Sequence, residues 1–459
     1  MAEEGKLHIV LLPWFAFGHM IPFLELSKLL AQKGHKVSFV ASPRNINRLP
    51  KTPPSFFPKL NFVEISLPHT EGLPENAEAT ADLPLDKIQY LKKAYDGLQQ
   101  PLTRFLETSK PNWIILDFAS YWLPPIAANL NISTAYFSVF TAPSHCFFGG
   151  SEHAFDRTEP EHYTVTPKWI PFPTSIRFRH YEILRLSDGF SENASGVSDL
   201  TRSFMTFDGC DLIALRSSFE FETEWLNLLQ QLQRKPVIPV GFLPKKIDND
   251  KEDADDTKSN SWKVIKKWLD KQVKESVLYI AFGSESTLSH AESTALAHGL
   301  EQSELPFLWA LRNGKLPEGF EDRIRPRGLI WTSWAPQLRI LSHDSVGGFL
   351  NHCGVSSVFE AIQMKKPMIL LPLFLDQGLI CRVLEEKKLG YPIPRDELDG
   401  SFTSESVAES VKLVMGEEEG KMYREKVKEM SGHFADHELQ DRYINQFINH
   451  LQHHGCRLP

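Results

Sequence analysis

The stretch Lys6–Ser42, KLHIVLLPWFAFGHMIPFLELSKLLAQKGHKVSFVAS, contains two apolar runs separated by a segment of helical pattern. Residues 6–14 predict a buried strand, because they form a short apolar run rich in β-forming side chains. Residues 21–35 carry leucines at helical spacing, and Gly34 suits the end of a helix. Residues 36–42 predict a second strand. A strand, a helix and a strand in this order predict a unit of a parallel sheet.

The same alternation continues along the chain, and it predicts an α/β fold built from parallel, doubly wound sheets. Residues 112–118 predict a strand, residues 122–130 a helix and residues 133–140 another strand. A second series begins at residue 276. Strands are predicted at residues 276–284, 306–312, 328–334, 346–352 and 367–373. Helices are predicted at residues 291–302 and from residue 356 onward.

The length of 459 residues favours two large domains. Between the two series lies the segment 243–261, which is highly charged and has almost no large apolar residues. Such a composition cannot bury a core, so this segment is predicted to be a linker. The expected organisation is a first Rossmann-like domain at 1–242, a second at 262–440, and a C-terminal helix at 441–459 that packs back on the first domain.

Composition excludes several classes of protein. The net charge of −8 provides no basic surface for nucleic acid. The five cysteines are widely spaced and form no C-x-x-C pair, which argues against a disulfide framework or a zinc site and for a reducing, cytoplasmic compartment. The chain begins with MAEEGK, which does not resemble a signal peptide, and no apolar run reaches the ~20 residues of a membrane span. The oligomeric state is left open, with a monomer favoured.

Residues 347–361, GGFLNHCGVSSVFEA, predict a strand, a tight loop and a helix. The first N–H groups of a helix lack internal partners and carry partial positive charge, so this loop is suited to hold a diphosphate. His352, Ser356 and Ser357 are candidate side-chain donors. From this stretch alone, a serine-capped helix with a buried histidine and no ligand is an equally good interpretation.

The surrounding residues favour the diphosphate. The segment that starts at WTSWAPQ and ends at LLPLFLDQ resembles the donor-binding signature of plant family 1 UDP-dependent glycosyltransferases, and its length matches without insertion. The resemblance implies the GT-B fold, in which two Rossmann-like domains face a cleft. The residues that carry it are Trp334, Pro336, Gln337, His352, Cys353, Gly354, Ser357, Glu360, Pro367, Pro372, Asp376 and Gln377.

This resemblance implies a role for each position of the signature. Trp334 would stack on uracil, a contact worth ~1–3 kcal/mol. Glu360 would accept bonds from the ribose hydroxyls, and Asp376 and Gln377 would bind the hydroxyls of the donor sugar. The expected donor-binding set is completed by Ser284, Ala335, Gln337, His352, Val355, Ser356 and Ser357, of which Ser284, His352 and Ser357 are assigned to the diphosphate.

Two positions depart from the family pattern, because Val355 and Ser356 stand where Trp and Asn are usual. The donor sugar therefore cannot be identified from the signature, and glucose and rhamnose are the leading candidates. Branch-forming members, which add a sugar to a sugar, vary at these positions and often carry F-G-S-E, as at Glu285 here. We therefore expect the acceptor to be a plant natural product that is already glycosylated, such as a flavonoid or terpenoid glucoside.

The acceptor hydroxyl needs a base, and histidine titrates near neutral pH. His19 follows the first strand, and Asp117 follows another strand of the same domain, so both are expected at the same edge of the sheet. A carboxylate bonded to one imidazole nitrogen fixes the tautomer of the ring. The resemblance likewise assigns the base to His19, within G-H-x-x-P, and its partner to Asp117. It implies an inverting displacement with a UDP-sugar as co-substrate and no metal.

Four other functions are alternatives to a transferase that extends a glycoside. Direct transfer to an aglycone stays open. A catalytically silent UDP-sugar-binding protein fits Val355, but it does not explain His19 and Asp117. A nucleotide-sugar epimerase on the same fold would need a small, carboxylate-lined pocket, whereas residues 143–200 are rich in aromatics and prolines. A dinucleotide-dependent oxidoreductase is disfavoured, because no G-x-G-x-x-G follows the first strand of either series.

Overall fold

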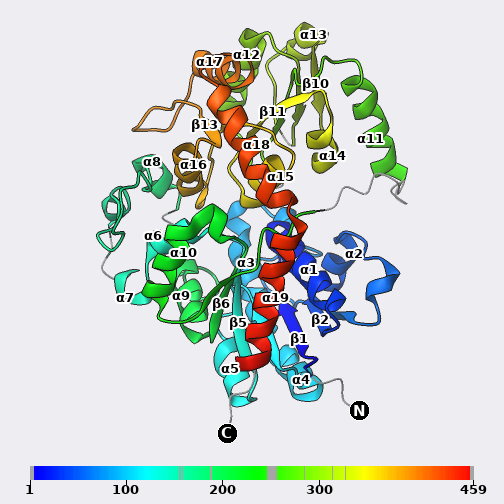
Figure 1. The fold of residues 1–459 in the computed structure, drawn as a ribbon, viewed down its shortest axis with the longest axis vertical. Coiled ribbons are helices and arrows are strands. Elements are labelled where there is room, and N and C mark those ends of the chain that lie inside the picture. Colours follow the sequence, from blue (N-terminus) through cyan, green and yellow to red (C-terminus); the bar gives the residue numbers. More distant parts are fainter. Residues whose placement is uncertain are drawn as a thin grey trace. The chain divides into compact units, whose positions relative to one another are not determined.

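The structure is a computed structural model, and it divides into two compact units that are described separately (Figure 1). The first unit comprises residues 1–158, 187–243 and 437–459, and the second comprises residues 159–186 and 244–436. The structure describes residues 5–154, 157, 159–186, 189–245, 256–283, 285–312, 314–325 and 327–454.

The first unit is built on a parallel sheet with the strand order β3-β2-β1-β4-β5-β6-β7. Its central strands are buried on both faces, which is why they are continuous apolar runs in the sequence. β1 pairs with β4, so that Leu12 lies opposite Leu116 at their carboxyl ends. The strands are β1 (His8–Leu12), β2 (Lys36–Ala41), β3 (Leu60–Glu64), β4 (Trp113–Leu116), β5 (Ser133–Ser138), β6 (Leu212–Leu215) and β7 (Val237–Pro239).

Helices connect these strands, and the last helix of the chain packs beside α1 in the same unit (Figure 1). This helix, α19 (His437–His454), begins before the predicted position 441. The carbonyl of Leu451 accepts a hydrogen bond from the indole of Trp113 at 2.9 Å. The other helices of the unit are α1 (Phe17–Gln32), α2 (Pro43–Arg48), α3 (Ile88–Asp96), α4 (Gln99–Ser109), α5 (Leu123–Asn129), α6 (Ala142–Phe148), α7 (Ser151–Ala154), α9 (Asp199–Gly209) and α10 (Phe219–Gln233).

The second unit is built on a parallel sheet with the strand order β10-β9-β8-β11-β12-β13. Its core includes the fully buried Trp309 on β9. The strands are β8 (Val277–Ala281), β9 (Phe307–Ala310), β10 (Gly328–Trp331), β11 (Val346–Asn351), β12 (Met368–Leu370) and β13 (Gly390–Pro392). The helices are α8 (His180–Leu184), α11 (Asp256–Leu269), α12 (His290–Ser303), α13 (Phe320–Ile324), α14 (Gln337–Ser342), α15 (Val355–Gln363), α16 (Gln377–Glu386), α17 (Ser404–Met415) and α18 (Lys421–Ala435).

The structure corrects two predicted boundaries. Residues 159–186, predicted in the first domain, belong to the second unit. Glu182 on α8 forms a buried ion pair with Arg382 on α16, with N···O distances of 2.9 and 3.0 Å. The predicted linker also ends too late, since α11 already starts at Asp256, and residues 246–255 lie outside the described residues.

None of the helices in the described part of the chain has the length and apolar composition that a membrane span requires.

Candidate active site

The first part of the candidate site lies at the carboxyl ends of β1 and β4. These strands are parallel neighbours in the sheet, so the segments that follow them start side by side. His19 lies in the first turn of α1, which follows β1, and Asp117 directly follows β4. His19 Nδ1 lies 2.8 Å from Asp117 Oδ2. The structure therefore brings the two residues predicted for proton transfer into direct contact.

The surroundings of Asp117 fix the orientation of His19. Asp117 is only 1% exposed, and its carboxylate accepts hydrogen bonds from the backbone N–H groups of Trp14 (2.9 Å) and Phe118 (2.8 Å). An ionised carboxylate is only an acceptor, so Nδ1 of a neutral His19 carries the proton and Nε2 carries the lone pair. This is the tautomer that a general base needs at Nε2.

Aromatic rings surround the imidazole of His19. The ring centroids of Phe118 and Phe140 lie 5.8 and 5.5 Å from that of His19. Trp14 contacts Phe118 edge-on, with 5.9 Å between the centroids. A proton-accepting nitrogen thus lies beside apolar surface, an arrangement suited to an aromatic or other apolar molecule that carries a hydroxyl.

The second part of the candidate site begins with His352, which follows β11. Its ring occupies space that two glycines leave open, because a Cβ added at Gly354 would lie 2.6 Å from His352 Nε2 and one at Gly283 would lie 3.0 Å away. Burial lowers the pKa of His352 to about 4, so the ring is neutral at pH 7. Its buried Nδ1 has no hydrogen-bond partner among the described residues. His352 therefore offers an unused polar atom beside the loop.

The N-terminus of α15 adjoins this histidine. Its N-cap residue is Gly354, which has no side chain to satisfy the first helical N–H groups. Val355 and Ser356 are half-buried in the first turn, whereas Ser357 is buried. Unsatisfied N–H groups and the helix dipole make such a terminus favourable for an anion.

Glu360, one turn further along α15, is buried and has a partner for each oxygen. Lys245 Nζ lies 2.5 Å from Oε1, and Gln337 Nε2 donates to Oε2 at 2.9 Å. Gln337 Nε2 also lies 3.1 Å from Ser357 Oγ. Lys245 is not among the residues predicted from the sequence, because it lies in a charged segment where nothing distinguishes one lysine from another.

The remaining predicted residues follow two other strands of the same sheet. Trp334 and Ala335 lie between β10 and α14, and Trp334 is 41% exposed, so it offers surface for stacking. Asp376 is the N-cap residue of α16, and the buried Gln377 begins this helix. Gln377 Oε1 accepts the N–H groups of residues 373 and 374, which leaves its Nε2 as the end that faces a ligand in the predicted role.

The structure thus gathers the predicted residues at the carboxyl ends of parallel strands, where open α/β sheets bind ligands. In the first unit, these residues are His19 and Asp117, which follow β1 and β4. In the second unit, the ends of β10, β11 and β12 carry Trp334, Ala335, Gln337, His352, Val355, Ser356, Ser357, Glu360, Asp376 and Gln377. Ser284 lies outside the described residues.

Across the described residues, no three His, Cys, Asp or Glu side chains are grouped so that they could hold a metal ion. Two Asp-x-Asp triplets, at 248–250 and 253–255, lie outside those residues.

Comparison with known proteins gives a consistent result. Residues 239–454 match the family described as UDP-glucoronosyl and UDP-glucosyl transferase. The chain is 51% identical to UDP-glycosyltransferase 91A1 of Arabidopsis thaliana, over 98% of this chain and 97% of that protein. It is 32% identical to the anthocyanidin-3-O-glucoside rhamnosyltransferase of Petunia hybrida, over 98% of this chain and 97% of that protein.

A solved structure shows the same architecture. UGT2 of Phytolacca americana, complexed with UDP-2fluoro-glucose and pterostilbene, superposes with a TM-score of 0.77 at 25% identity. The match covers 98% of this chain and 100% of that chain. It confirms the predicted fold class, two Rossmann-like α/β domains of the GT-B type.

Proposed function

This chain belongs to the UDP-dependent glycosyltransferase family, and we propose that it transfers a sugar, glucose or rhamnose, from UDP to a hydroxyl of a small plant natural product with inversion at the anomeric carbon. The observation that carries the proposal is the contact of 2.8 Å between His19 Nδ1 and the buried Asp117, because it leaves Nε2 as the base.

The second unit supplies the groups that suit a UDP-sugar. In the proposed complex, uracil stacks on Trp334 and the ribose hydroxyls bond to Glu360. The diphosphate is held at the N-terminus of α15, next to His352 and Ser357. Asp376 and Gln377 follow β12 and bond to the sugar. This arrangement is supported by the exposed Trp334, by the lack of a side-chain cap at Gly354 of α15, and by His352 Nδ1, which has no hydrogen-bond partner in the part of the chain that the structure describes.

Transfer is a single displacement. His19 Nε2 takes the proton of the acceptor hydroxyl while its oxygen attacks the anomeric carbon. The bond between that carbon and the UDP oxygen breaks, and its electron pair leaves with UDP. Asp117 stabilises the imidazolium that forms on His19. The helix N-terminus stabilises the negative charge that grows on the diphosphate.

We further propose that the acceptor already carries a sugar. Val355 has a much smaller side chain than the tryptophan that is usual at this position, and Glu285 follows β8 in the second unit. The Petunia relative is named for a glucoside acceptor and for rhamnose transfer, which supports the same class here.

Competition between an aglycone and its own monoglucoside tests this acceptor class. Equal concentrations are incubated with the enzyme and either UDP-glucose or UDP-rhamnose, and the product masses are read. We expect the diglycoside to predominate. Predominance of the monoglycoside would reject the glycoside acceptor but keep the transferase, whereas absence of any product from a broad acceptor panel would reject both.

Trp334→Ala is expected to weaken UDP binding by about 5- to 150-fold, because stacking on a base contributes ~1–3 kcal/mol. Turnover at saturating donor should change far less, since the uracil is unaltered in the transition state. Calorimetric titration with UDP and steady-state kinetics provide the two values. Phe57→Ala is the control, because it removes an exposed aromatic side chain of the first unit. It should change neither the affinity for UDP nor the turnover. A fall in turnover with unchanged UDP affinity would contradict the assignment of Trp334.

A further inference from the structure

Arg202 on α9 is fully buried, although it takes no part in the proposed proton transfer or donor binding. Its guanidinium forms a bidentate ion pair with Asp96 at the end of α3. The distances are 2.7 Å from Nη1 to Oδ1 and 2.5 Å from Nη2 to Oδ2. Burying an arginine costs several kcal/mol unless its hydrogen bonds are well satisfied. A hydrophobic residue would join α3 to α9 without this cost, which indicates that the arginine has a further role.

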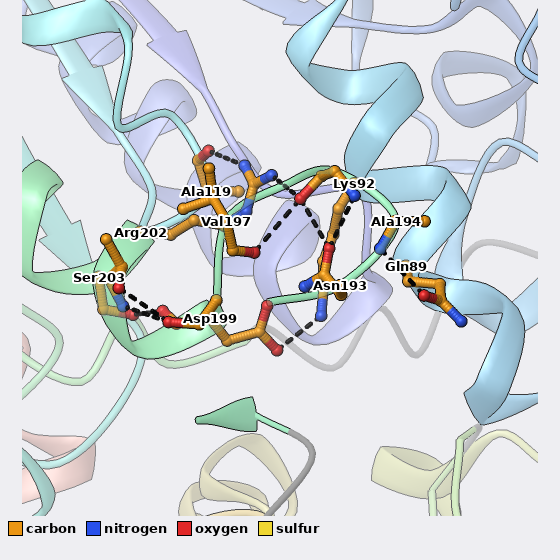
Figure 2. Close-up of polar contacts among 12 residues, drawn as sticks. Gln89, Lys92, Ala119, Asn193, Ala194, Val197, Asp199, Arg202 and Ser203 are labelled. Carbon is orange, nitrogen blue, oxygen red and sulfur yellow. Dashed lines mark hydrogen bonds and ion pairs between the residues drawn. The ribbon is translucent and has the colours of Figure 1, made fainter. Parts of the chain in front are cut away.

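The guanidinium also holds the turn that follows Asp117. Nη1 donates to the carbonyl oxygen of Ala119 at 3.1 Å, and the guanidinium carbon lies 4.9 Å from the ring centroid of Tyr121. Figure 2 shows Arg202 pointing from α9 toward Ala119. One turn along the same helix, Thr206 Oγ1 lies 2.9 Å from the carbonyl oxygen of Phe118. Two side chains of α9 therefore fix the carbonyls of the two residues directly after Asp117.

Helix α3 holds the same turn from its other end. Asp96 Oδ1, which pairs with Arg202, also accepts the indole N–H of Trp122 at 3.2 Å. The neighbouring Tyr95 hydroxyl lies 3.0 Å from Ser120 Oγ and 3.1 Å from the carbonyl oxygen of Pro13. Pro13 precedes Trp14, whose N–H is one of the donors to Asp117. The ion pair thus sits at the junction of both chain segments that bond to Asp117.

A loop covers the guanidinium on its remaining side. Ser195 Oγ lies 2.6 Å from Arg202 Nη2, and Asn193 Oδ1 accepts the backbone N–H of Ser195 at 3.0 Å. The N–H of Ala194 donates to Gln89 Oε1 on α3 at 3.0 Å (Figure 2). Both terminal nitrogens of Arg202 are therefore bonded, to side chains and to one backbone carbonyl, which gives the guanidinium a fixed direction. Its buried Nε has no hydrogen-bond partner among the described residues.

We propose that Arg202, paired with Asp96, is a positioning residue for sugar transfer: it holds the Phe118–Tyr121 turn and thereby fixes the Asp117 carboxylate against His19. Because the N–H of Phe118 bonds to Asp117 Oδ1, a displacement of this turn moves the carboxylate away from the imidazole. The inference rests on the proposed function of His19 and Asp117. It adds to their site a residue, Arg202, that is distant from both in the sequence.

Arg202→Lys and Arg202→Gln test the proposal. Lysine keeps the charge beside Asp96 but lacks the planar fork that reaches Ala119 as well. Since misplacement by about 1 Å can cost ~10²-fold in rate, we expect turnover to fall about 10-fold for lysine and about 100-fold for glutamine. The affinity for UDP should stay unchanged, because the donor-binding residues lie in the second unit. Thr206→Val removes the contact with the Phe118 carbonyl without loss of a charge, and it should lower turnover several-fold. This variant keeps the proposal testable if Arg202→Gln does not fold.

Lys92→Met is the matched control. Lys92 Nζ pairs with Asp199 Oδ2 at 2.6 Å, so it also joins α3 to α9 (Figure 2). Among the described residues, no hydrogen bond or ion pair joins Lys92 to the turn after Asp117. This variant should lose an ion pair between the same two helices and keep full turnover. An equal loss of turnover in Lys92→Met and Arg202→Lys would mean that helix packing alone matters, and it would overturn the proposal.

A double-mutant cycle separates positioning from a general loss of structure. If Arg202 acts through Asp117, then Arg202→Lys should change turnover less than about 2-fold in an Asp117→Asn background. Full multiplication of the two effects would overturn the proposal. If His19→Ala itself keeps normal turnover, the proposed base is wrong. If His19→Ala is inactive and Arg202→Lys is fully active, only the role of Arg202 is wrong.

Discussion

Replacing His19 by alanine will lower the turnover number of sugar transfer by about 10²–10⁴-fold, the range that loss of a general base typically costs. The affinity for UDP should not change, because His19 belongs to the first unit and the residues proposed for the nucleotide belong to the second. Product formation at saturating donor and acceptor gives the turnover, and calorimetry gives the UDP affinity.

Two observations make the interpretation of His19→Ala specific. His69 is an exposed histidine of the same unit, so His69→Ala is the matched control and should keep full activity. Unfolding curves of both variants should overlay that of the unmodified protein. A His19→Ala variant with unchanged turnover would remove this residue from the mechanism, whatever the acceptor is.

Asp117→Asn is expected to reduce turnover by up to about 10⁴-fold, as the equivalent change does in the Ser-His-Asp triad. Asparagine has the shape of aspartate, but it carries an N–H₂ group and no negative charge. It can turn the imidazole of His19 to the tautomer with the proton on Nε2, and it cannot stabilise the imidazolium. The measurement is steady-state turnover over a range of pH, together with a thermal unfolding curve.

Asp211→Asn is the control for the second prediction. Asp211 also accepts a backbone N–H, that of Thr134 at 2.8 Å, so the same substitution there weakens a comparable contact in the same unit. We expect it to lower stability slightly and to leave turnover unchanged. If Asp117→Asn unfolds the protein at ordinary temperature, or folds and remains fully active, Asp117 holds the structure of the turn and does not serve the base.

Most strands inside the two sheets were predictable because burial on both faces makes them continuous apolar runs. β1 and β11 are examples, and both were expected within a few residues of their observed bounds. The four-residue strand β6 was not identified, although it is an interior strand and fully buried. The strand β3 was not identified, since it lies at the edge of its sheet and only its first residue is buried. Helix α11 was not predicted for a similar reason, because its first residues are polar and the buried Ile265 and Leu269 lie near its end.

The candidate site could be predicted to the extent that its residues lie close together in the sequence. The residues from Trp334 to Gln377 form one continuous signature, and His19 lies in a short motif. Lys245 and Arg202 could not be found in this way, because Lys245 meets Glu360 across 115 positions and Arg202 meets Asp96 across 106. Contacts at such separations depend on the arrangement of whole helices, which local sequence patterns do not contain.

The assignment of residues 159–186 to the second unit has a consequence for building chimeric enzymes. A crossover at residue 243 would join the first half of this chain to the second half of a relative with another donor preference. Such a chimera would keep Glu182 but exchange Arg382, its partner across 200 positions. Unless the relative has a matching arginine, a buried carboxylate would lose its counter-ion, at a cost of about 3–5 kcal/mol. The unit of exchange is residues 159–186 together with residues 244–436, so a recombinant gene needs three junctions besides the one at residue 243 to transfer it intact.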